Sequence, residues 1–405
     1  MSQSILQVLG LQGFVVYKQW EENQDVVIKI GRPRKWAICP HCGQGTGRVN
    51  DRGKERRWYH SRINGRRVLL QGRLRRFWCP SCQRAFTETY PGIRLRARRT
   101  EQAEREVLEE LRTGTFGALR KRFGVAYRTA TKALQRLVPR QLDLGKLLKN
   151  VPEAALGIDE HSFRGNDLVC TVTLLQPCRQ LVAILDDDRQ ATLRAYLQGL
   201  PEDVRAKIRW VCTDLKPSYR KVVQQVLPQA KVVVDHFHVI QDANRRLDQA
   251  RILEQQDWRR SIPRWPLVKN FERLTPKQEL QLHSILHAYP VIAAFYRLKE
   301  ALRDLYAATS PAEANLLMDR IFTNAETSDI PELKQWARTL RAWRSELLAY
   351  FQNRISNGFT EGVHTKIKLL KRLSFGFRNL QVYVRKMLLA FLPPLSADPS
   401  PHLLT

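Results

Sequence analysis

Long hydrophobic runs are missing from this 405-residue sequence. No apolar stretch approaches the ~20 residues that a bilayer-spanning helix needs, which argues against an integral membrane protein. The first residues, MSQSILQVLGLQGFVV, lack the basic leader of a secretory signal peptide, and YKQWEE, which follows, is typical of an ordered domain. We therefore expect a cytoplasmic protein with no membrane partner.

Acidic residues are also scarce relative to basic ones. Lys and Arg number 68 against 39 Asp and Glu, so the formal net charge is +29. Residues 1–150 hold 32 basic and 12 acidic side chains, and 32 minus 12 places +20 of the excess in this part of the chain. With 43% hydrophobic residues, the chain is long enough for two or three domains with their own cores, which excludes a disordered polycation.

The basic surplus indicates a polyanionic partner. Lys and Arg that neutralise phosphates release condensed counterions, which favours nucleic acid binding. A protein that binds membrane surfaces would carry its charge on an amphipathic helix, whereas the early charge here lies in strand-like segments such as RINGRRVLLQGRLRRFW. Nucleic acid is therefore the predicted partner, and a generally basic soluble protein is the alternative.

Four of the seven cysteines form two short repeats, CPHCG with Cys39 and Cys42 and CPSCQ with Cys79 and Cys82. Paired CxxC units seldom form disulfides in a reducing cytosol, and four thiolates match the tetrahedral ligand set of structural zinc. About 36 residues separate the two turns, which is longer than the ~15 to 20 of compact zinc ribbons and leaves room for β-hairpins. We predict a zinc ribbon with a structural Zn²⁺ ion, and a redox dithiol or unligated cysteines are the alternatives.

The segment after the ribbon is predicted to be helical. EQAEREVLEELRTG carries apolar residues at helical spacing and ends at a glycine. TFGALRKRFGVAYRTATKALQRLV then has the pattern of two helices joined at Gly124, as in a helix-turn-helix whose second helix enters a DNA major groove. A plain helical linker is the alternative. The residues expected to contact DNA are Tyr127, Arg128, Thr129 and Lys132.

Strands and helices alternate from residue 152 onward. The segments ALGIDEHSF, DLVCTVTLLQ and RQLVAILDD predict three strands, and QATLRAYLQGLP, KIRWVCTDL, PSYRKVVQQVLP and AKVVVDHFHV continue as helix, strand, helix and strand. This order predicts a mixed sheet flanked by helices. Asp159 ends the first predicted strand and Asp214 the fourth, and ligands and metals collect at strand ends in such sheets. The stretch from about Val239 to Ile355 is too long for a loop and is predicted to be an inserted helical subdomain.

A single acid, Glu361, begins the helix of TEGVHTKIKLLKR, in which every other charge is positive. Grouped carboxylates repel each other unless a cation neutralises them, and Mg²⁺ is held by a few carboxylates together with phosphate oxygens. Two strand-end aspartates and Glu361 form such a set. The residues on this helix that could contact a phosphodiester are His364, Thr365, Lys366, Lys368, Lys371 and Arg372.

This order of segments resembles the DDE transposases of bacterial insertion sequences of the ISL-three class. The resemblance covers nearly the whole chain, and its main motifs are GIDEHSF, CTDLKPSYRKVV, AKVVVDHFHVI and SNGFTEGVHTKIKLLKRLSFGFRN. It implies a ribonuclease-H-like catalytic core with an Asp-Asp-Glu triad that binds Mg²⁺ or Mn²⁺. On this sequence the triad falls on Asp159, Asp214 and Glu361. His364 stands where the family pattern EGxN has Asn.

Asp235 is the rival candidate for the second acid. It forms an Asp-x-x-His pattern with His238, which resembles a motif that follows the second catalytic Asp in relatives of these transposases. Asp214 ends the fourth strand, from which the ribonuclease-H-like pattern takes its second acid, so we favour Asp214 as the metal ligand. Asp235 and His238 are then expected to support the ligands or to position a DNA strand, and a locally bonded core histidine is the alternative for His238.

The predicted fold class is multidomain α/β, a ribonuclease-H-like mixed sheet with a long all-helical insertion, preceded by a zinc ribbon and a helix-turn-helix domain. The predicted domains are a zinc-ribbon DNA-binding domain (1–95), a helix-turn-helix DNA-binding domain (96–150), the first part of the catalytic core (151–240), the helical insertion (241–355), the second part of the core with the Glu361 helix (356–393) and a loose tail (394–405).

The resemblance implies a bacterial DNA transposase that binds the terminal inverted repeats of an insertion sequence, cuts the DNA and joins it to target DNA. It also implies a homodimer on double-stranded DNA and association with the nucleoid when bound. One alternative is a non-catalytic DNA-binding repressor derived from a transposase. Another is a structure-specific nuclease of the same fold, which would cut without joining.

Overall fold

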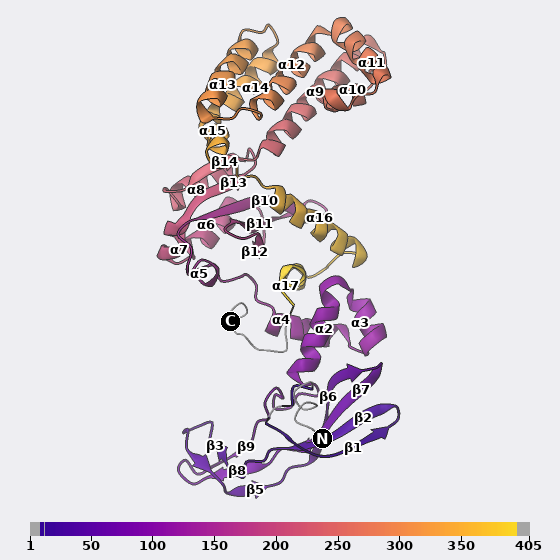
Figure 1. Cartoon of the computed structure of the whole chain (residues 1–405), viewed down its shortest axis with the longest axis vertical. Helices are drawn as coiled ribbons and strands as arrows, with labels where there is room; N and C mark the ends of the chain where they lie inside the picture. The colour runs from indigo at the N-terminus through magenta and orange to yellow at the C-terminus, as the bar shows by residue number, and fades with distance from the viewer. Residues whose placement is uncertain (1–8, 12, 395–405) are drawn as a thin grey trace. The chain divides into compact units, whose positions relative to one another are not determined.

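The computed structural model describes residues 9–11 and 13–394 (Figure 1). The predicted loose tail therefore lies outside the described residues from residue 395 onward. None of the helices in the described ranges is both long enough and apolar enough to cross a membrane.

The chain divides into two compact units. Among the described residues, the first unit comprises the chain up to Pro139 together with Leu373–Phe375 and residues 381–394. The second unit comprises Arg140–Arg372 and Gly376–Leu380. The basic, cysteine-containing part of the sequence thus belongs to one unit, and the predicted strand-end acids and Glu361 belong to the other.

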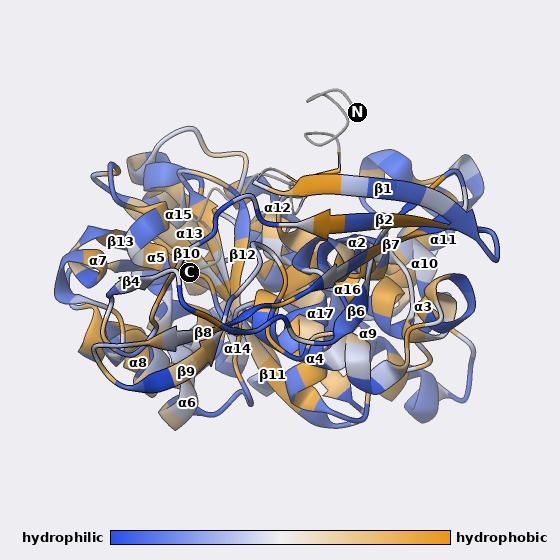
Figure 2. Cartoon of the chain, turned by 90° about the horizontal axis from the view of Figure 1, so that it is seen from below, coloured by the Kyte–Doolittle hydropathy of each residue, from blue (hydrophilic) through white to orange (hydrophobic). Residues whose placement is uncertain are grey.

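A four-stranded sheet in the order β1-β2-β7-β6 forms the centre of the first unit. Asn64 and Gly65 join its two last strands with φ angles of 48° and 80°, the positive values that a two-residue type I′ hairpin requires. Apolar residues of the sheet pack around the buried Trp58, and Figure 2 shows β2 as hydrophobic over most of its length. The strands are β1 (Val15–Glu22), β2 (Asp25–Gly31), β6 (Glu55–Ile63) and β7 (Arg66–Arg73).

Five short strands carry the cysteines. β3 pairs with β4, and β5, β8 and β9 form an antiparallel sheet. Phe77 and Phe86 stack beside the cysteines with their ring centroids 5.9 Å apart. A core this small buries little apolar surface, so it needs a further stabilising element such as a metal. The strands are β3 (Ala37–Ile38), β4 (Gly45–Thr46), β5 (Val49–Asp51), β8 (Arg76–Cys79) and β9 (Arg84–Thr87).

The helices of the first unit within the described residues are α2 (Glu101–Thr113), α3 (Phe116–Phe123), α4 (Tyr127–Leu137) and α17 (Leu380–Phe391). Gly124 ends α3 with a φ of 60°, which lets the chain turn at once into α4. The buried ammonium of Lys386 in α17 donates to the carbonyl oxygen of Arg112 in α2 at 3.1 Å. The last helix therefore packs in the first unit, whereas the sequence-based boundaries place it at the end of the catalytic core.

A five-stranded sheet in the order β12-β11-β10-β13-β14 lies at the centre of the second unit. β10, β11 and β12 are antiparallel, and β13 and β14 run parallel to β10, so the sheet is mixed as the sequence predicts. The strands are β10 (Ala154–Arg164), β11 (Asp167–Gln176), β12 (Gln180–Ile184), β13 (Ile208–Thr213) and β14 (Lys231–Val234). The helices around it are α5 (Leu144–Leu147), α6 (Gln190–Gln198), α7 (Glu202–Lys207), α8 (Pro217–Val226) and α16 (Gly358–Leu373).

Alternation of side chains along β10 determines which helix each residue meets. Gly157 lies against α16, where an added Cβ would come 2.6 Å from Thr360 Oγ1. Glu160 points to the other face and pairs with Lys216, at the start of α8. The face of β10 that carries Gly157 and Asp159 is therefore covered by the helix that carries Glu361.

A helical bundle is inserted between β14 and α16 (Figure 1). Its core contains Trp336, which is fully buried and stacks on Phe295 with ring centroids 6.0 Å apart. Proline stands in the first turn of most of its helices, where its missing N–H costs no hydrogen bond. The elements are α9 (His236–Trp258), α10 (Trp265–Val268), η1 (Phe271–Arg273), α11 (Pro276–Ala288), α12 (Pro290–Leu305), α13 (Pro311–Glu326), α14 (Pro331–Ala342) and α15 (Arg344–Asn353).

Candidate functional site

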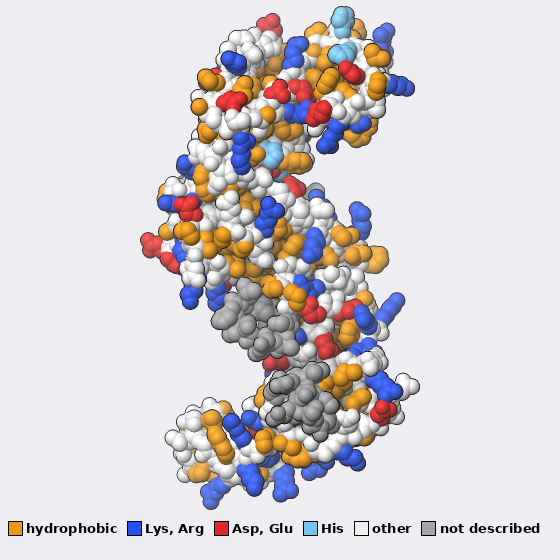
Figure 3. Space-filling view, in the orientation of Figure 1, with side chains coloured by type: hydrophobic (Ala, Val, Ile, Leu, Met, Phe, Trp, Pro, Cys, Tyr) orange, Lys and Arg blue, Asp and Glu red, His pale blue; other side chains and the backbone are white. Residues whose placement is uncertain are grey.

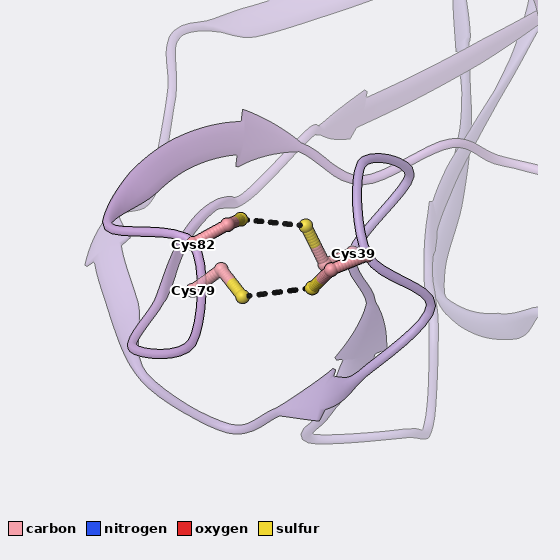
Figure 4. A group of neighbouring side chains, drawn as sticks. Cys39, Cys79 and Cys82 are labelled. Atoms are coloured by element: carbon pink, nitrogen blue, oxygen red, sulfur yellow. Dashed lines mark hydrogen bonds between the residues drawn. The ribbon is translucent and has the colours of Figure 1, made fainter.

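The four cysteines of the two CxxC turns lie together in the first unit (Figure 4). Cys39 Sγ lies 3.6 Å from Cys82 Sγ, and Cys42 Sγ lies 3.5 Å from Cys79 Sγ. Sulfurs bound at about 2.3 Å to a tetrahedral zinc ion lie about 3.8 Å apart, so this arrangement fits the ion. Gly43 shapes the first turn with a φ of 74° and donates its N–H to the carbonyl oxygen of Cys39 at 2.9 Å. The backbone of this turn thus holds the sulfurs of Cys39 and Cys42 in place for a metal ion.

Three aspartates lie side by side at one edge of the sheet in the second unit. The last residues that pair between β10 and β13 are Gly157 and Cys212. Asp159 lies two residues after Gly157, and Asp214 lies two residues after Cys212. β13 and β14 pair through Thr213 and Val234, and the next residues along are Asp214 and Asp235. Asp159 lies within β10, which continues to Arg164, rather than at its end. Both predicted strand acids and the rival Asp235 are therefore at the same level of the sheet.

The environments of the three aspartates differ. Asp159 is buried, and its Oδ1 accepts the N–H of Glu160 at 2.7 Å. Asp235 is only 1% exposed, and its Oδ1 accepts the backbone N–H of Asn357, just before α16, at 3.2 Å. Asp214 is half-buried and lines an open cleft of about 640 Å³ that continues along α9. Of the two candidates for the second acid, Asp214 borders open space and Asp235 fastens the start of α16.

Glu361 lies in the first turn of α16 and approaches the aspartates from the side of the helix. His238, in the first turn of α9, donates from Nε2 to Glu361 Oε1 at 3.0 Å. Asp159, Glu361 and His364 each offer a ligand atom, and these atoms lie within 4.8 Å of one another. Asp214 stands outside this group of three but close enough that its charge affects Asp159. The fold thus brings Asp159 and Glu361 together from distant segments of the chain, with Asp214 nearby at the end of β13.

Negative charge accumulates at this point. Burial raises the pKa of Asp159 to about 7, and although His238 opposes that rise, the carboxylates of Asp214 and Glu361 add to it. Burial also raises the pKa of Asp214. The hydrogen bond between His238 and Glu361 raises the pKa of His238 to about 9 and lowers that of Glu361. One imidazolium therefore neutralises part of the carboxylate charge, and a divalent cation would favour full ionisation of all three acids.

A chain of buried polar groups lies behind Asp159. His364 is 3% exposed, and its Nδ1 lies 3.4 Å from Asp159 Oδ2. Its Nε2 lies 3.0 Å from Thr171 Oγ1, and the same hydroxyl lies 2.8 Å from His161 Nδ1. Burial lowers the pKa of His364 to about 4 and that of His161 to about 2, so both rings are neutral at pH 7. His364 therefore lies in the interior beside a predicted metal ligand and not on the exposed face of α16.

The remaining predicted DNA contacts are divided between two helices. All four residues predicted from the second helix of the helix-turn-helix are exposed on α4: Tyr127, Arg128, Thr129 and Lys132. On α16, Lys368 and Arg372 are exposed, and Lys366 and Lys371 are half-buried. The ammonium of Lys371 donates to the carbonyl oxygen of Ser162 at the end of β10.

Sequence reasoning missed three residues of this site, His161, Thr171 and Asn357. Strand alternation was the signal for His161, because it stands two residues after Asp159 and shares its face of β10. Thr171 was not predictable in this way, since its position opposite Asp159 depends on the register between β10 and β11. Asn357 precedes the Glu361 helix in the SNGFTEG motif, but its contact with Asp235 joins segments that are far apart in the sequence.

Comparison with known proteins identifies the family of this chain and its cysteine-containing segment. A family model described as a transposase, of the ISL3 class, matches residues 156–387, which is more than half of the chain. The chain belongs to the ISL3 family of transposases. A second model, described as the zinc-finger of transposase IS204/IS1001/IS1096/IS1165, matches residues 35–82 of this transposase and includes all four cysteines. The predicted family, the fold class and the transposase function are thereby confirmed, as is the zinc ribbon.

Two curated relatives match this transposase over most of its length. It is 27% identical over 397 residues to the transposase for insertion sequence element IS1001 of Bordetella parapertussis, which covers 94% of this chain and 96% of the relative. It is 25% identical over 418 residues to the transposase for insertion sequence element IS1557 of Mycobacterium tuberculosis, with 93% and 92% covered. Among solved structures, the Drosophila P element transposase strand transfer complex aligns with a TM-score of 0.41 and 14% identity over 75% of this chain and 94% of that one. That score supports no inference about this chain.

Proposed function

We propose that this transposase cuts DNA at the ends of an insertion sequence and joins the resulting 3′ ends to target DNA by a DDE mechanism. The observation that carries the proposal is the convergence of Asp159, Asp214 and Glu361 at one edge of the sheet, beside an open cleft. Buried carboxylates repel each other, so an apo protein gains nothing from collecting them unless a cation is to bind. His238 balances only part of the charge of the three carboxylates, and a bound metal ion would balance the rest.

The donor set fits Mg²⁺ or Mn²⁺. Carboxylate oxygens are the ligands that these hard cations prefer, and a half-open site leaves positions for water and phosphate oxygens. When bound, such ions neutralise charge on the phosphate and activate the attacking water or 3′ hydroxyl. Asp214 is the second ligand in this proposal because it borders the cleft. Asp235 is buried, and one of its oxygens already accepts the backbone N–H of Asn357.

The chain's own residues set the geometry around these ligands. The N–H of Glu160 and the imidazole of His364 each face one oxygen of Asp159, so the carboxylate is oriented before metal or DNA arrives. His238 holds Glu361 in the same way through its 3.0 Å hydrogen bond. The exposed Lys368 and Arg372 on the same helix are placed to contact the DNA backbone. Positioning and charge neutralisation carry phosphoryl transfer without a covalent protein intermediate.

Recognition of the DNA ends falls to the first unit in this proposal. The zinc ribbon and the α3–α4 pair, acting as a helix-turn-helix, bind the terminal inverted repeats, with the exposed face of α4 in the major groove. Two ends must be cut and joined together, so a homodimer on DNA is part of the proposal. The bacterial cytoplasm, with the nucleoid as the site of action, is the predicted location.

The test is cleavage and joining of labelled DNA that carries the element's own terminal repeats, with Mg²⁺ or Mn²⁺. We expect wild-type protein to cut and join, and Glu361→Gln to bind the same DNA without chemistry. Glu160→Gln is the matched control, since this neighbouring acid points to the other face of β10 and pairs with Lys216. Binding without cleavage in the wild type would support a repressor instead, and cutting without joining would support a nuclease.

A further inference from the structure

A basic cleft of about 500 Å³ opens in the first unit between the main sheet and the short strands of the zinc ribbon. Its lining includes three glycines, two tyrosines and a single acid, Glu55. Figure 3 shows basic side chains gathered over the strands of the first unit, with few acidic ones between them. The basic side chains that line this cleft are Lys29, Arg32, Lys35, Arg52, Arg73 and Arg75.

Ion pairs within the protein satisfy only part of this charge. Glu55 is shared by Lys29, at 3.5 Å, and Arg73, at 4.0 Å, and Arg75 pairs with the buried Glu88 at 2.8 Å.

The other three basic side chains, Arg32, Lys35 and Arg52, have no acidic partner among the described residues. Arg32 donates from Nη1 to the carbonyl oxygen of Thr89 at 3.1 Å, and its Nε is buried without a hydrogen-bond partner in the described part of the chain. The cleft therefore keeps unpaired positive charge and at least one unused donor.

The lining also limits what kind of ligand the cleft could take. Pockets for small apolar ligands are lined mainly by hydrophobic and aromatic side chains, and this lining is mainly basic. Arg32 and Lys35 lie on the loop between β2 and β3, and Arg52 lies on the loop between β5 and β6, so these charges are spread over two loops and suit an extended polyanion better than one compact anion. Tyr17 is 62% exposed at the cleft and can pack on a sugar or a base.

We propose that this cleft seats the phosphate backbone of duplex DNA, as a contact separate from the exposed face of α4. The inference rests on the proposed function, since it assigns a further contact to the same DNA. Backbone contacts fix register and orientation but carry no sequence information, so the cleft would anchor the ribbon while other residues read the bases.

The test removes charge from the two exposed, unpaired residues. Lys35→Gln combined with Arg52→Gln is compared with Lys18→Gln combined with Arg84→Gln, an exposed pair on β1 and β9 that lies outside the cleft. Full-length proteins bind labelled duplexes over a range of salt without Mg²⁺ or Mn²⁺, so that no chemistry occurs. Zinc content and circular dichroism confirm that each variant is folded.

The cleft variant should lower the slope of log K against log salt by about two, roughly one for each lost phosphate contact, and by the same amount on end-sequence and unrelated DNA. The control pair should leave the slope nearly unchanged. Equal slopes in the two variants would overturn the proposal, as would a loss confined to end-sequence DNA. Failure of the proposed function would appear separately, as absent cleavage in the wild type.

A second inference rests on the hydrogen bonds behind Asp159. The hydroxyl of Thr171 lies between His161 Nδ1 and His364 Nε2, and it has one proton to donate. If it donated to His161, His364 would have to donate to it from Nε2, and a ring with a single proton would then turn the Nδ1 lone pair toward the ionised carboxylate at Asp159 Oδ2. The opposite direction avoids this repulsion: His161 donates to Thr171, Thr171 donates to His364 and His364 Nδ1–H points to the carboxylate.

We infer that Thr171 is a positioning residue that sets the tautomer of His364 and so aims the Asp159 carboxylate. Removing a hydrogen-bond partner behind a metal ligand typically weakens metal binding by about 10- to 100-fold. Thr171→Val keeps the shape of the fully buried side chain but loses the hydroxyl, and Thr171→Ser keeps the hydroxyl.

Two measurements test the role of Thr171. In metal-free protein, the ¹⁵N chemical shifts of His364 should show the Nδ1–H tautomer in wild type and Thr171→Ser and lose that preference in Thr171→Val. Mn²⁺ affinity from electron paramagnetic resonance should fall at least about tenfold in Thr171→Val and be restored in Thr171→Ser. An unchanged tautomer or equal Mn²⁺ affinity in both variants would refute the inference. Absence of Mn²⁺ binding in the wild type would instead count against the proposed function.

Discussion

The cysteine site and the carboxylate site of this transposase are built in opposite ways. The cysteine site consists of two CxxC turns, and each turn supplies two sulfurs from four consecutive residues. Its four ligands are all thiolates, which fill a tetrahedral coordination shell. The carboxylate site draws Asp159, Asp214 and Glu361 from a strand, a strand end and a helix, and it borders an open cleft. A closed ligand set suits a structural ion, and an open one suits a catalytic ion that must also contact substrate.

The surroundings of the two sites differ for the same reason. Around the cysteines the apolar core is small, so the metal has to supply folding free energy. Around the carboxylates most residues of the central strands are buried and the helical bundle has a large apolar core, so the fold can tolerate the repulsion of buried like charges. The zinc ribbon therefore depends on its metal for stability, and the second unit is stable enough to keep an unfavourable arrangement of charge.

Loss of zinc should have the largest effect and tests whether the ribbon needs its metal to fold. We expect Cys79→Ser to unfold the five short strands of the ribbon, β3, β4, β5, β8 and β9, since binding of structural zinc contributes about 10 to 16 kcal/mol in zinc-finger peptides. Hydrogen exchange should show lost protection there and unchanged protection in β10–β14. Protection retained across β8 and β9 in zinc-free protein would mean that the apolar core suffices.

Loss of a carboxylate should have the reverse effect, a large change in chemistry with little change in folding. Asp159→Asn is expected to slow DNA cleavage at least about a hundredfold, because several kcal/mol of charge stabilisation depend on the ligand set. In metal-free protein its melting temperature should equal or exceed that of the wild type, because one of three neighbouring carboxylates is removed. A variant that melts well below the wild type would show that Asp159 has a mainly structural role.

The contact between α16 and β10 allows a finer test. In Gly157→Ala the new Cβ would lie 2.5 to 2.6 Å from side-chain oxygens of Thr173, Asn357 and Thr360, so helix and strand must separate. We expect a loss of about 1 to 3 kcal/mol in the free energy of unfolding, together with weaker Mn²⁺ binding. Gly362→Ala is the stability control, because its Cβ would meet no atom within 4 Å. Equal denaturation midpoints for the two variants would contradict this packing.

The smallest expected effect concerns acid stability of the first unit. Burial lowers the pKa of His60, whose ring lies 3.0 Å from Thr100 Oγ1 and 2.6 Å from the carbonyl oxygen of Leu9. The unfolded chain therefore binds the proton more tightly, and this contribution is complete above the ordinary pKa of 6.5 and is lost as the pH falls below it.

His60→Gln should remove this part of the pH dependence, about 1 kcal/mol or less between pH 7.5 and 5.5. Denaturant unfolding of zinc-loaded wild type and variant, measured side by side, cancels the effect of acid on the cysteines. If the free energy of unfolding falls with pH in the same way for both proteins, the loss of stability in acid would belong to the zinc site alone.

The two sites also differ in how far the sequence predicts them. The CxxC spacing determines the zinc ligands because each pair is local, and the residues between the pairs need only form hairpins. The acids were predictable as candidates from strand ends and the helix start, but the preference for Asp214 over Asp235 came from the strand order of the family pattern and not from the local sequence of either residue. Both follow strands, and only tertiary contacts separate the one at the cleft from the one bonded to Asn357.

Two further features depend on the fold rather than on local pattern. His364 shares a helix face with basic residues, so periodicity suggested a DNA contact, but its proximity to β10 places it in the interior. The helix over 380–391 follows the Glu361 helix in sequence yet packs with α2, where Lys386 is buried against a carbonyl oxygen. Neither outcome follows from hydrophobic periodicity, because both depend on which surface each helix meets.

Helix α9 connects the carboxylate site of the second unit directly to the core of the helical bundle. It begins immediately after Asp235, holds Glu361 through His238 in its first turn, and continues for 23 residues into the core of the helical bundle. At 1.5 Å per residue this is a lever arm of about 35 Å, and a tilt of about 5° at its base displaces the far end by about 3 Å. A tilt of α9 at either end would therefore move the bundle and His238, the residue that holds Glu361, together.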